Sequence, residues 1–300
     1  MASNDAMHLD AVGSQKGNSR GKRILLEAIA ILLLLLVLTP FVVVLFNAGK
    51  TYDQITLSPV TPPSDWSMVL TNIKAVFNDP TTDLLGAFLD SLTITGVSLA
   101  IIIFFSSMAA WVLVRNKSKF SKFSFMLFVA AMVVPFQVVM YPLVYFLKGI
   151  GDTLGFPVLG TYHGIVFAYL GFGCSLSIFI FHGFIKGVPL ALEESAFIDG
   201  CSQPGVFFKI IFPLLTPTVM TVAILNGIWI WNDYLLPLLV LGGNGQVQTI
   251  PLAVTAFAGA YVKQWNLIMT TSLLAMVPIV VLFLFAQRYI IKGMVEGAIK

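Results

Sequence analysis

Charged residues are scarce in this chain: Asp, Glu, Lys and Arg make up only 10% of its 300 residues, whereas about 25% is usual in a soluble domain. Hydrophobic residues make up 58%, and the mean hydropathy is +0.92. A soluble core does not require so little charge, so most of the surface is expected to face lipid. The net charge of +3 is too small to suggest nucleic acid as a partner, and no basic cluster is interleaved with aromatic residues.

Residues with reactive or metal-binding side chains are also few. The two cysteines, Cys174 and Cys201, fall in an apolar segment and in a polar loop, so no disulfide is expected. The three histidines are scattered and form no H-E-x-x-H pattern. The stretch 17–22 has three residues between its glycines instead of the four of a phosphate-binding loop, and no Ser or Thr follows the lysine. No catalytic residue, metal site or bound cofactor is therefore predicted. An intramembrane enzyme would need a paired nucleophile and base, and no such pair stands out in the sequence.

The apolar residues are grouped in six segments that each reach the length of about 20 residues needed to cross a bilayer as a helix. The sequence thus predicts an all-α, polytopic membrane protein with six transmembrane helices. Prolines inside the segments are compatible with this, because neighbouring helices can satisfy the backbone groups that they free. The predicted segments are 24–47, 86–114, 123–147, 164–185, 214–241 and 267–288.

The distribution of basic residues predicts the orientation of the chain. Of the 17 Lys and Arg residues, all but Lys50, Lys74, Lys148 and Lys263 fall in the tails and loops on one side of the six segments. Basic residues concentrate in cytoplasmic loops, so both termini are predicted to be cytoplasmic. The basic start could belong to a signal peptide, but the apolar run after it is too long, which favours a retained first helix.

These assignments give a predicted order of parts along the chain. A short amphipathic helix over Trp66–Phe77 is expected within the long outer loop. The parts are a cytoplasmic tail (1–23), a first helix with its outer loop (24–85), a core membrane domain (86–288) and a second cytoplasmic tail (289–300).

The loop 186–213, on the predicted cytoplasmic side, has the signals of two short helices joined by a turn. Pro189 suits the first turn of a helix, and Gly200 suits its end, where a left-handed residue is needed. Ser202 is a good N-cap for a second helix that Pro204 would open. From these signals alone, an ordinary amphipathic loop at the membrane surface is as good an explanation as a functional element.

The residues of this loop resemble the E-A-A-x-x-x-G-x9-I-x-L-P loop of bacterial ABC importer permeases. The spacing matches throughout, while Ser195 replaces the first Ala and Phe212 replaces Leu. The resemblance implies that the loop contains the coupling helix, which docks in a groove of a separate ATP-hydrolysing subunit. The residues implied in coupling are Glu194, Ser195, Ala196, Asp199, Gly200, Ile210 and Pro213.

Weaker motifs resemble the carbohydrate-uptake, maltose-permease-like subfamily. Asp90-Ser91-Leu92 is similar to its Asn-Ser-Leu element, with Asp in place of Asn, and Trp231-Asn232-Asp233 followed by Pro237 resembles its W-N-(D/E)-x-x-x-P element. The stretch 286–300 resembles its closing A-Q-R segment with the later Gly-Ala pair. The resemblance covers about residues 24–300.

This resemblance implies a permease subunit of the type-I ABC importer fold in the bacterial plasma (inner) membrane, carrying a sugar, with a di- or oligosaccharide favoured. The implied partners are a second homologous permease, two ATPase subunits and an extracytoplasmic solute-binding protein. ATP and Mg would bind at the ATPase subunits and none at this chain. The coupling loop would serve a non-sugar solute equally well, and an ion-coupled secondary carrier remains a less favoured alternative.

Four polar or aromatic residues within the apolar segments are candidates for the substrate pathway. Trp231, Asn232 and Asp233 combine an aromatic ring with an amide and a carboxylate, which suits the C–H faces and hydroxyls of a sugar. Asp90 is the fourth candidate, because an ionisable residue in a membrane segment is costly. The alternatives are an aromatic belt with an interhelical hydrogen bond for the first three, and a helix N-cap at the interface for Asp90.

Overall fold

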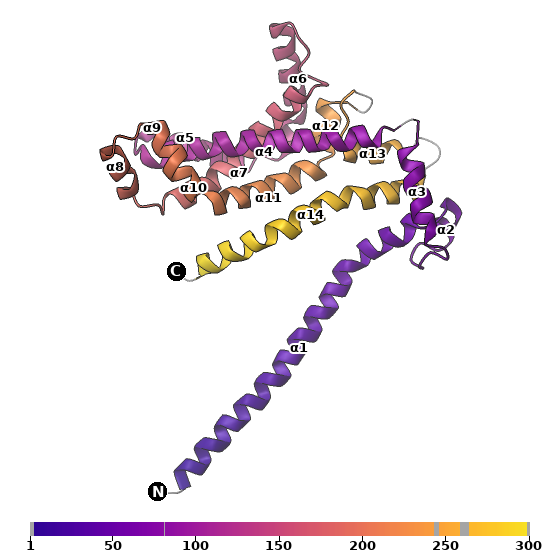
Figure 1. The fold of residues 1–300 in the computed structure, drawn as a ribbon, viewed down its shortest axis with the longest axis horizontal. Coiled ribbons are helices and arrows are strands. Elements are labelled where there is room, and N and C mark those ends of the chain that lie inside the picture. Colours follow the sequence, from indigo (N-terminus) through magenta and orange to yellow (C-terminus); the bar gives the residue numbers. More distant parts are fainter. Residues whose placement is uncertain (1–2, 81, 243–245, 259–263, 299–300) are drawn as a thin grey trace. The chain divides into compact units, whose positions relative to one another are not determined.

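The computed structural model of the chain describes residues 3–80, 82–242, 246–258 and 264–298. The regular elements in these ranges are all helical (Figure 1), which confirms the predicted all-α class. The backbone separates into two compact units, Met1–Ile73 with Trp265–Leu273, and Lys74–Gln264 with Leu274–Lys300. We refer to them as unit 1 and unit 2.

Unit 1 contains α1, α2 and the first parts of α3 and α14. The apolar stretch Arg20–Ala48 of α1 has 29 residues and a mean hydropathy of 3.2, so it is long and apolar enough to cross a bilayer. The predicted amphipathic helix over Trp66–Phe77 is present as α3. The bounds are α1 Ser3–Ala48, α2 Tyr52–Leu57, α3 Ser67–Phe77 and α14 Trp265–Ala298.

Polar side chains fix the turn that follows α1. The Nδ2 atom of Asn72 donates hydrogen bonds to the carbonyl oxygens of Ala48, at 2.8 Å, and Lys50, at 3.0 Å. The buried Lys50 amine donates to the carbonyl oxygen of Ser58 at 2.7 Å, and burial lowers its pKa. Buried polar groups need such partners, so these bonds determine where the chain turns after α1.

Unit 2 contains the remaining helices, with α4, α7 and α11 packed side by side (Figure 1). The helices α8 and α9, with the π-helix η1 and α10, lie between α7 and α11 in the sequence. The bounds are α4 Leu84–Arg115, α5 Lys119–Ala131, α6 Phe136–Leu154, α7 Tyr162–Ile185, α8 Ala191–Ile198, α9 Gln203–Val206, η1 Phe207–Ile211, α10 Phe212–Leu214, α11 Thr216–Asn232, α12 Leu235–Val240 and α13 Ile250–Ala256.

Small residues allow α4, α7 and α11 to pack closely. A Cβ atom at Gly173 of α7 would lie 2.5 Å from the Cδ1 atom of Ile102 and 3.0 Å from the Oδ1 atom of Asn226. The Nδ2 atom of Asn226 donates to the hydroxyl of Ser177 at 3.0 Å. Small residues with interhelical hydrogen bonds are typical of helix contacts in membranes, where the hydrophobic effect does not hold helices together.

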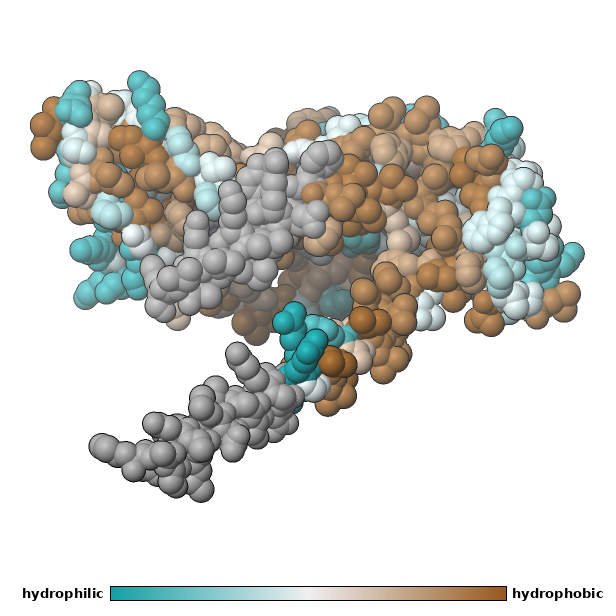
Figure 2. Space-filling view, turned by 60° about the horizontal axis from the view of Figure 1, so that its bottom comes forward, coloured by the Kyte–Doolittle hydropathy of each residue, from teal (hydrophilic) through white to brown (hydrophobic). Residues whose placement is uncertain are grey.

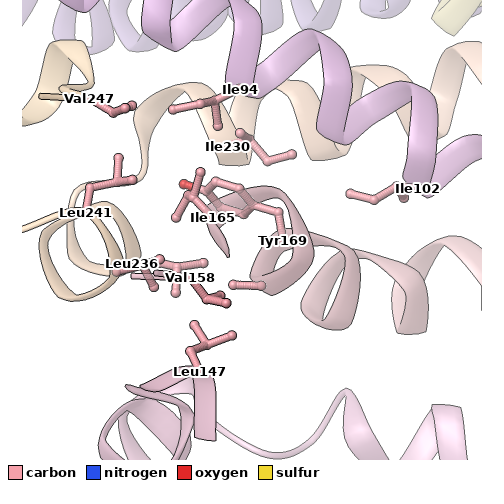
Figure 3. Close-up of a cluster of buried hydrophobic side chains, with 12 residues drawn as sticks. Ile94, Ile102, Leu147, Val158, Ile165, Tyr169, Ile230, Leu236, Leu241 and Val247 are labelled. Carbon is pink, nitrogen blue, oxygen red and sulfur yellow. The ribbon is translucent and has the colours of Figure 1, made fainter. Parts of the chain in front are cut away.

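One core of unit 2 lies where α4, α7 and α11 meet α6 and α12. Figure 3 shows Tyr169 among the aliphatic side chains that surround it. Its labelled members are Ile94, Ile102, Leu147, Val158, Ile165, Tyr169, Ile230, Leu236, Leu241 and Val247.

Two of the six predicted membrane segments are not continuous helices. The segment 123–147 is divided between α5 and α6, which meet at an angle of 107°. Pro135 directly precedes α6. A proline ring disfavours the helical conformation of the residue before it, so the helix is interrupted there. In the segment 214–241, the chain bends by 73° between Gln203–Leu214 and α11. The helix is interrupted a second time between the end of α11 and the start of α12.

The other four segments are single helices that are long and apolar enough to cross a membrane. The helices of the described residues therefore provide four such candidates, or up to six if each bent pair crosses the membrane once.

Candidate functional site: the elbow between α7 and α11

The loop 186–213 forms the two short helices that the sequence predicts, and we call it the elbow. Gly200 has φ = +83°, the left-handed conformation that ends α8. The hydroxyl of Ser202 accepts a hydrogen bond from the backbone N–H of Gly205 at 3.4 Å and caps α9. The prediction that Pro189 lies in the first turn of α8 is wrong, because α8 begins at Ala191. Pro189 precedes the helix, and its carbonyl accepts from the N–H of Leu192 at 3.3 Å.

One side of the elbow is buried against α4 and α7. Ala196 is buried, which accounts for a small residue at this position of the motif. Ile210 packs against the same buried cluster from η1. The buried members of this cluster are Ala110, Trp111, Ile178, Phe181, Ile185, Ala196, Val206, Phe207, Ile211, Leu215 and Val222.

The opposite side of α8 faces away from α4 and α7. Glu194, Ser195 and Asp199 are exposed there, so the predicted coupling residues separate into an anchoring set and a free set. Phe197 is 47% exposed and Ile198 is 86% exposed. Two large apolar side chains beside carboxylates on one short helix make a surface that suits a protein partner.

Figure 2 shows hydrophilic side chains interspersed with hydrophobic ones at the end of unit 2 that carries α8 and α9, and mainly hydrophobic side chains along the helices beyond it. This end of unit 2 therefore has the polarity of a membrane–water boundary.

The structure also brings together a polar cluster that the sequence did not predict. The Oε1 atom of Glu193 lies 2.7 Å from the Nε atom of Arg115, and its Oε2 atom accepts from the indole N–H of Trp111 at 3.0 Å. The Nη2 atom of Arg115 donates to the carbonyl oxygen of Val188 at 3.0 Å. The side chain of Glu193 is only 3% exposed, so both of its oxygens depend on these partners. The cluster ties α8 to the end of α4.

The elbow joins α11 through a stretch of irregular helix. Residues Phe207–Ile211 form the π-helix η1, in which the N–H of Phe212 donates to the carbonyl of Phe207. The predicted residue Pro213 lies in the short helix α10 that follows, and the chain bends at Leu215 before α11 begins. Single π-turns are frequent at functional sites.

Asp90 lies far along the chain from the elbow, within α4. One carboxylate oxygen accepts from the hydroxyl of Tyr162, and the other accepts from the backbone N–H of Gln248 at 2.8 Å. The alternative interpretation of Asp90 as an N-cap is wrong, because α4 begins at Leu84 and Asp83 caps it by accepting from the N–H of Gly86.

The other three pathway candidates point to different partners. The indole N–H of Trp231 donates to the carbonyl of Ala275 at 3.0 Å, and the amide of Asn232 donates within its own helix. Asp233 accepts from the hydroxyl of Tyr169 at 3.2 Å and from the N–H of Leu235 at 3.1 Å. Asp233 thus marks the end of α11 and the start of α12, and its role in a substrate pathway stays a prediction.

A cavity of about 800 Å³ lies between α5, α6, α7 and α11. It is mainly apolar, with Asn226 and Trp229 among the few lining groups that can form hydrogen bonds. None of the four predicted pathway residues lines it. Trp229 packs edge-on against Tyr169 with ring centroids 5.4 Å apart, which links this cavity to the partner of Asp233.

Comparison with known proteins shows the family to which the chain belongs. Residues 102–296 match the family model described as "Binding-protein-dependent transport system inner membrane component". This match covers more than half of the chain, which therefore belongs to this family of inner membrane transport components. The resemblance to ABC importer permeases is confirmed.

Two relatives and one solved structure show the extent of the similarity. The chain is 40% identical to the probable starch degradation products transport system permease protein AmyC of Thermoanaerobacterium thermosulfurigenes, over 93% of this chain and 97% of AmyC. It is 32% identical to the multiple sugar-binding transport system permease protein MsmG of Streptococcus mutans, over 89% and 93% of the two chains.

The solved structure is a chain of a bacterial ABC transporter involved in the import of the acidic polysaccharide alginate. The alignment has a TM-score of 0.72 at 19% identity and covers 90% of this chain and 98% of the other. The two chains therefore share a fold.

Proposed function

We propose that this chain is the permease subunit of an ATP-driven importer for an oligosaccharide, and that the elbow docks on a separate ATPase subunit. The observation that carries this proposal is the exposed pair Phe197 and Ile198 on α8, beside Glu194 and Asp199. A helix anchored on one side and apolar on the other fits a groove on a partner protein. The names of AmyC and MsmG support a sugar as the cargo.

The proposal includes the remaining subunits and the orientation. The importer would contain a second homologous permease, two ATPase subunits and an extracytoplasmic solute-binding protein, with ATP and Mg bound by the ATPases. Each bent helix pair would cross the membrane once, which gives six crossings with both termini in the cytoplasm. The predominance of basic residues on that side supports this orientation.

The elbow would transmit force and take no part in chemistry. ATP-driven closure of the ATPase dimer would displace α8, and the Arg115–Glu193 pair with the buried cluster would pass this displacement to α4 and α7. Packed groups transmit displacement because protein interiors have few voids and low compressibility.

A matched pair of variants at Gly200 tests the docking role. A Cβ atom there would meet no atom within 4 Å, so only the positive φ restricts the residue. Asn tolerates the left-handed region, whereas Val does not. We expect Gly200→Val to lower both the recovery of the ATPase with the tagged permease and the uptake of labelled maltooligosaccharides, about tenfold or more. Gly200→Asn should keep both. Equal recovery and uptake in the Val variant would contradict the proposal.

A further inference from the structure

A groove of about 680 Å³ opens at the end of unit 2 that carries the elbow. It lies where α4 ends, where α5 begins and where α7 ends. The linking residues Asn116 and Lys117 and the first residues of the elbow, Lys186, Val188 and Leu190, complete its walls. The coupling residues Glu194, Ser195, Ala196, Asp199, Gly200, Ile210 and Pro213 do not line it. The groove therefore adjoins the start of α8 but does not include the residues proposed to dock.

The lining of the groove carries positive charge without acidic residues. Lys117, Lys122 and Lys186 are exposed, and no Asp or Glu is among the lining residues. Arg115 also lines the groove, but its charge is balanced by Glu193. Within the described ranges, none of the three lysines takes part in an ion pair. Their charges are thus not balanced by a carboxylate in the part of the chain that the structure describes.

The interior of the groove is apolar. Leu113, Phe125, Met126 and Val188 are among its lining residues. The ring of Phe125 stacks on that of His182, with centroids 3.8 Å apart, which gives the groove one flat wall. A soluble phosphate would leave these apolar groups exposed, whereas an amphiphile with a phosphate and a hydrocarbon chain would cover them.

We propose that this groove binds an anionic phospholipid, with its phosphodiester among Lys117, Lys122 and Lys186 and the upper part of an acyl chain along Phe125. Basic pockets between membrane helices on the cytoplasmic side suit anionic headgroups. Ser121 in the first turn of α5 also lines the groove, so the positive end of that helix dipole adds to the attraction. The proposal goes beyond the transport function and shares with it only the orientation, which places the groove at the level of the cytoplasmic headgroups.

The test is native mass spectrometry of the full-length chain in a neutral detergent, titrated with phosphatidylglycerol or with phosphatidylcholine of the same acyl chains. The groove variant replaces Lys117, Lys122 and Lys186 by Gln. The matched control replaces three other exposed lysines by Gln and so loses the same charge; these are Lys74, Lys119 and Lys209.

We expect the wild type and the control to bind phosphatidylglycerol about 100-fold more tightly than phosphatidylcholine. The groove variant should bind phosphatidylglycerol about 100-fold more weakly than the wild type, at about fivefold for each lysine. Its affinity for phosphatidylcholine should stay within about twofold, which shows that the variant is folded.

Three results would overturn the proposal. The first is unchanged phosphatidylglycerol binding in the groove variant, and the second is an equal loss in the control. The third is complete displacement of the lipid by millimolar inorganic phosphate, which would identify a free anion as the occupant. All of these measurements use the chain alone, so their failure would leave the docking role of α8 intact, and loss of that role would not affect them.

Discussion

The ion pair between Glu193 and Arg115 gives the sharpest test of how the elbow is anchored. The variant Glu193→Gln keeps the size of the side chain but removes the charge that faces Arg115, 2.7 Å away. Removal of one partner from a buried pair costs about 3–5 kcal/mol, because the other charge is left without compensation. The Arg115 side chain is 21% exposed and can regain some water, so we expect about 2–3 kcal/mol here.

This loss should appear as local opening of the elbow. Hydrogen exchange measures the free energy of such opening, and each 1.4 kcal/mol is a factor of about ten. The buried amides of the elbow, such as those of Ala196 and Val206, should therefore exchange about 30- to 150-fold faster in Glu193→Gln than in the wild type. Amides in the middle of α7 should keep their wild-type rates.

The neighbouring residue provides the matched control. Glu194 carries the same charge on the same helix, but it is exposed and forms no ion pair among the described residues. Glu194→Gln should therefore leave exchange in the elbow unchanged. In Glu193→Gln/Arg115→Met the uncompensated cation is gone. The opening free energy should therefore fall by less in this double variant than the sum of the falls in the two single variants. Wild-type exchange in Glu193→Gln would refute the view that this pair anchors α8.

Three further predictions concern other parts of unit 2. Gly173→Ala places a Cβ atom against Ile102 and Asn226, so it should lower the free energy of unfolding by about 1–3 kcal/mol. A Cβ atom at Gly171 would meet no other atom within 4 Å, so Gly171→Ala should cause no such loss, and urea titration in detergent measures the difference. Asp90→Ala leaves the N–H of Gln248 without its acceptor, so exchange at this amide should rise about tenfold, and an unchanged rate would show that another group holds it. With Cys174 replaced by Ser, a membrane-impermeant maleimide should label Cys201 in inside-out vesicles and not in intact cells, whereas the reverse pattern would invert the proposed orientation.

The sequence was sufficient to predict the elbow because its signals are local. Gly200 ends α8, Ser202 caps α9, and Pro204 lies in the first turn of α9. Each residue acts through its own backbone geometry or on neighbours within a few positions. The all-helical class was equally accessible, since membrane-length apolar segments leave few other ways to satisfy the backbone.

The breaks in the membrane segments could not be predicted in this way. Hydropathy reports whether a residue prefers lipid and says nothing of the direction of the chain. Proline does not resolve the question either, because Pro142 lies inside α6 whereas Pro135 precedes it at a sharp bend. Which proline interrupts a helix depends on the packing around it, and that information is not local.

The anchoring cluster was missed for a related reason. Arg115 and Glu193 are 78 positions apart, and each resembles an ordinary charged residue at the end of a helix. Glu193 also stands directly before Glu194, and only burial distinguishes the two. In the sequence, the only sign of this cluster is that Trp111 and Arg115 lie one turn apart on α4. Such a pair is too common to indicate that a buried carboxylate binds both.

The division of α8 into an anchored side and a free side has a consequence for how such a subunit can be redesigned or can diverge. Glu193 and Ala196 hold the helix in place, while Glu194, Ser195 and Asp199 face outward. Substitutions on the outward side leave the anchoring contacts untouched, so under the proposed docking the recognition of an ATPase subunit and the retention of the fold are separable traits. Under the proposed docking, a chimaera that exchanges these three residues together with Phe197 and Ile198 would change its partner without a compensating change in the membrane helices.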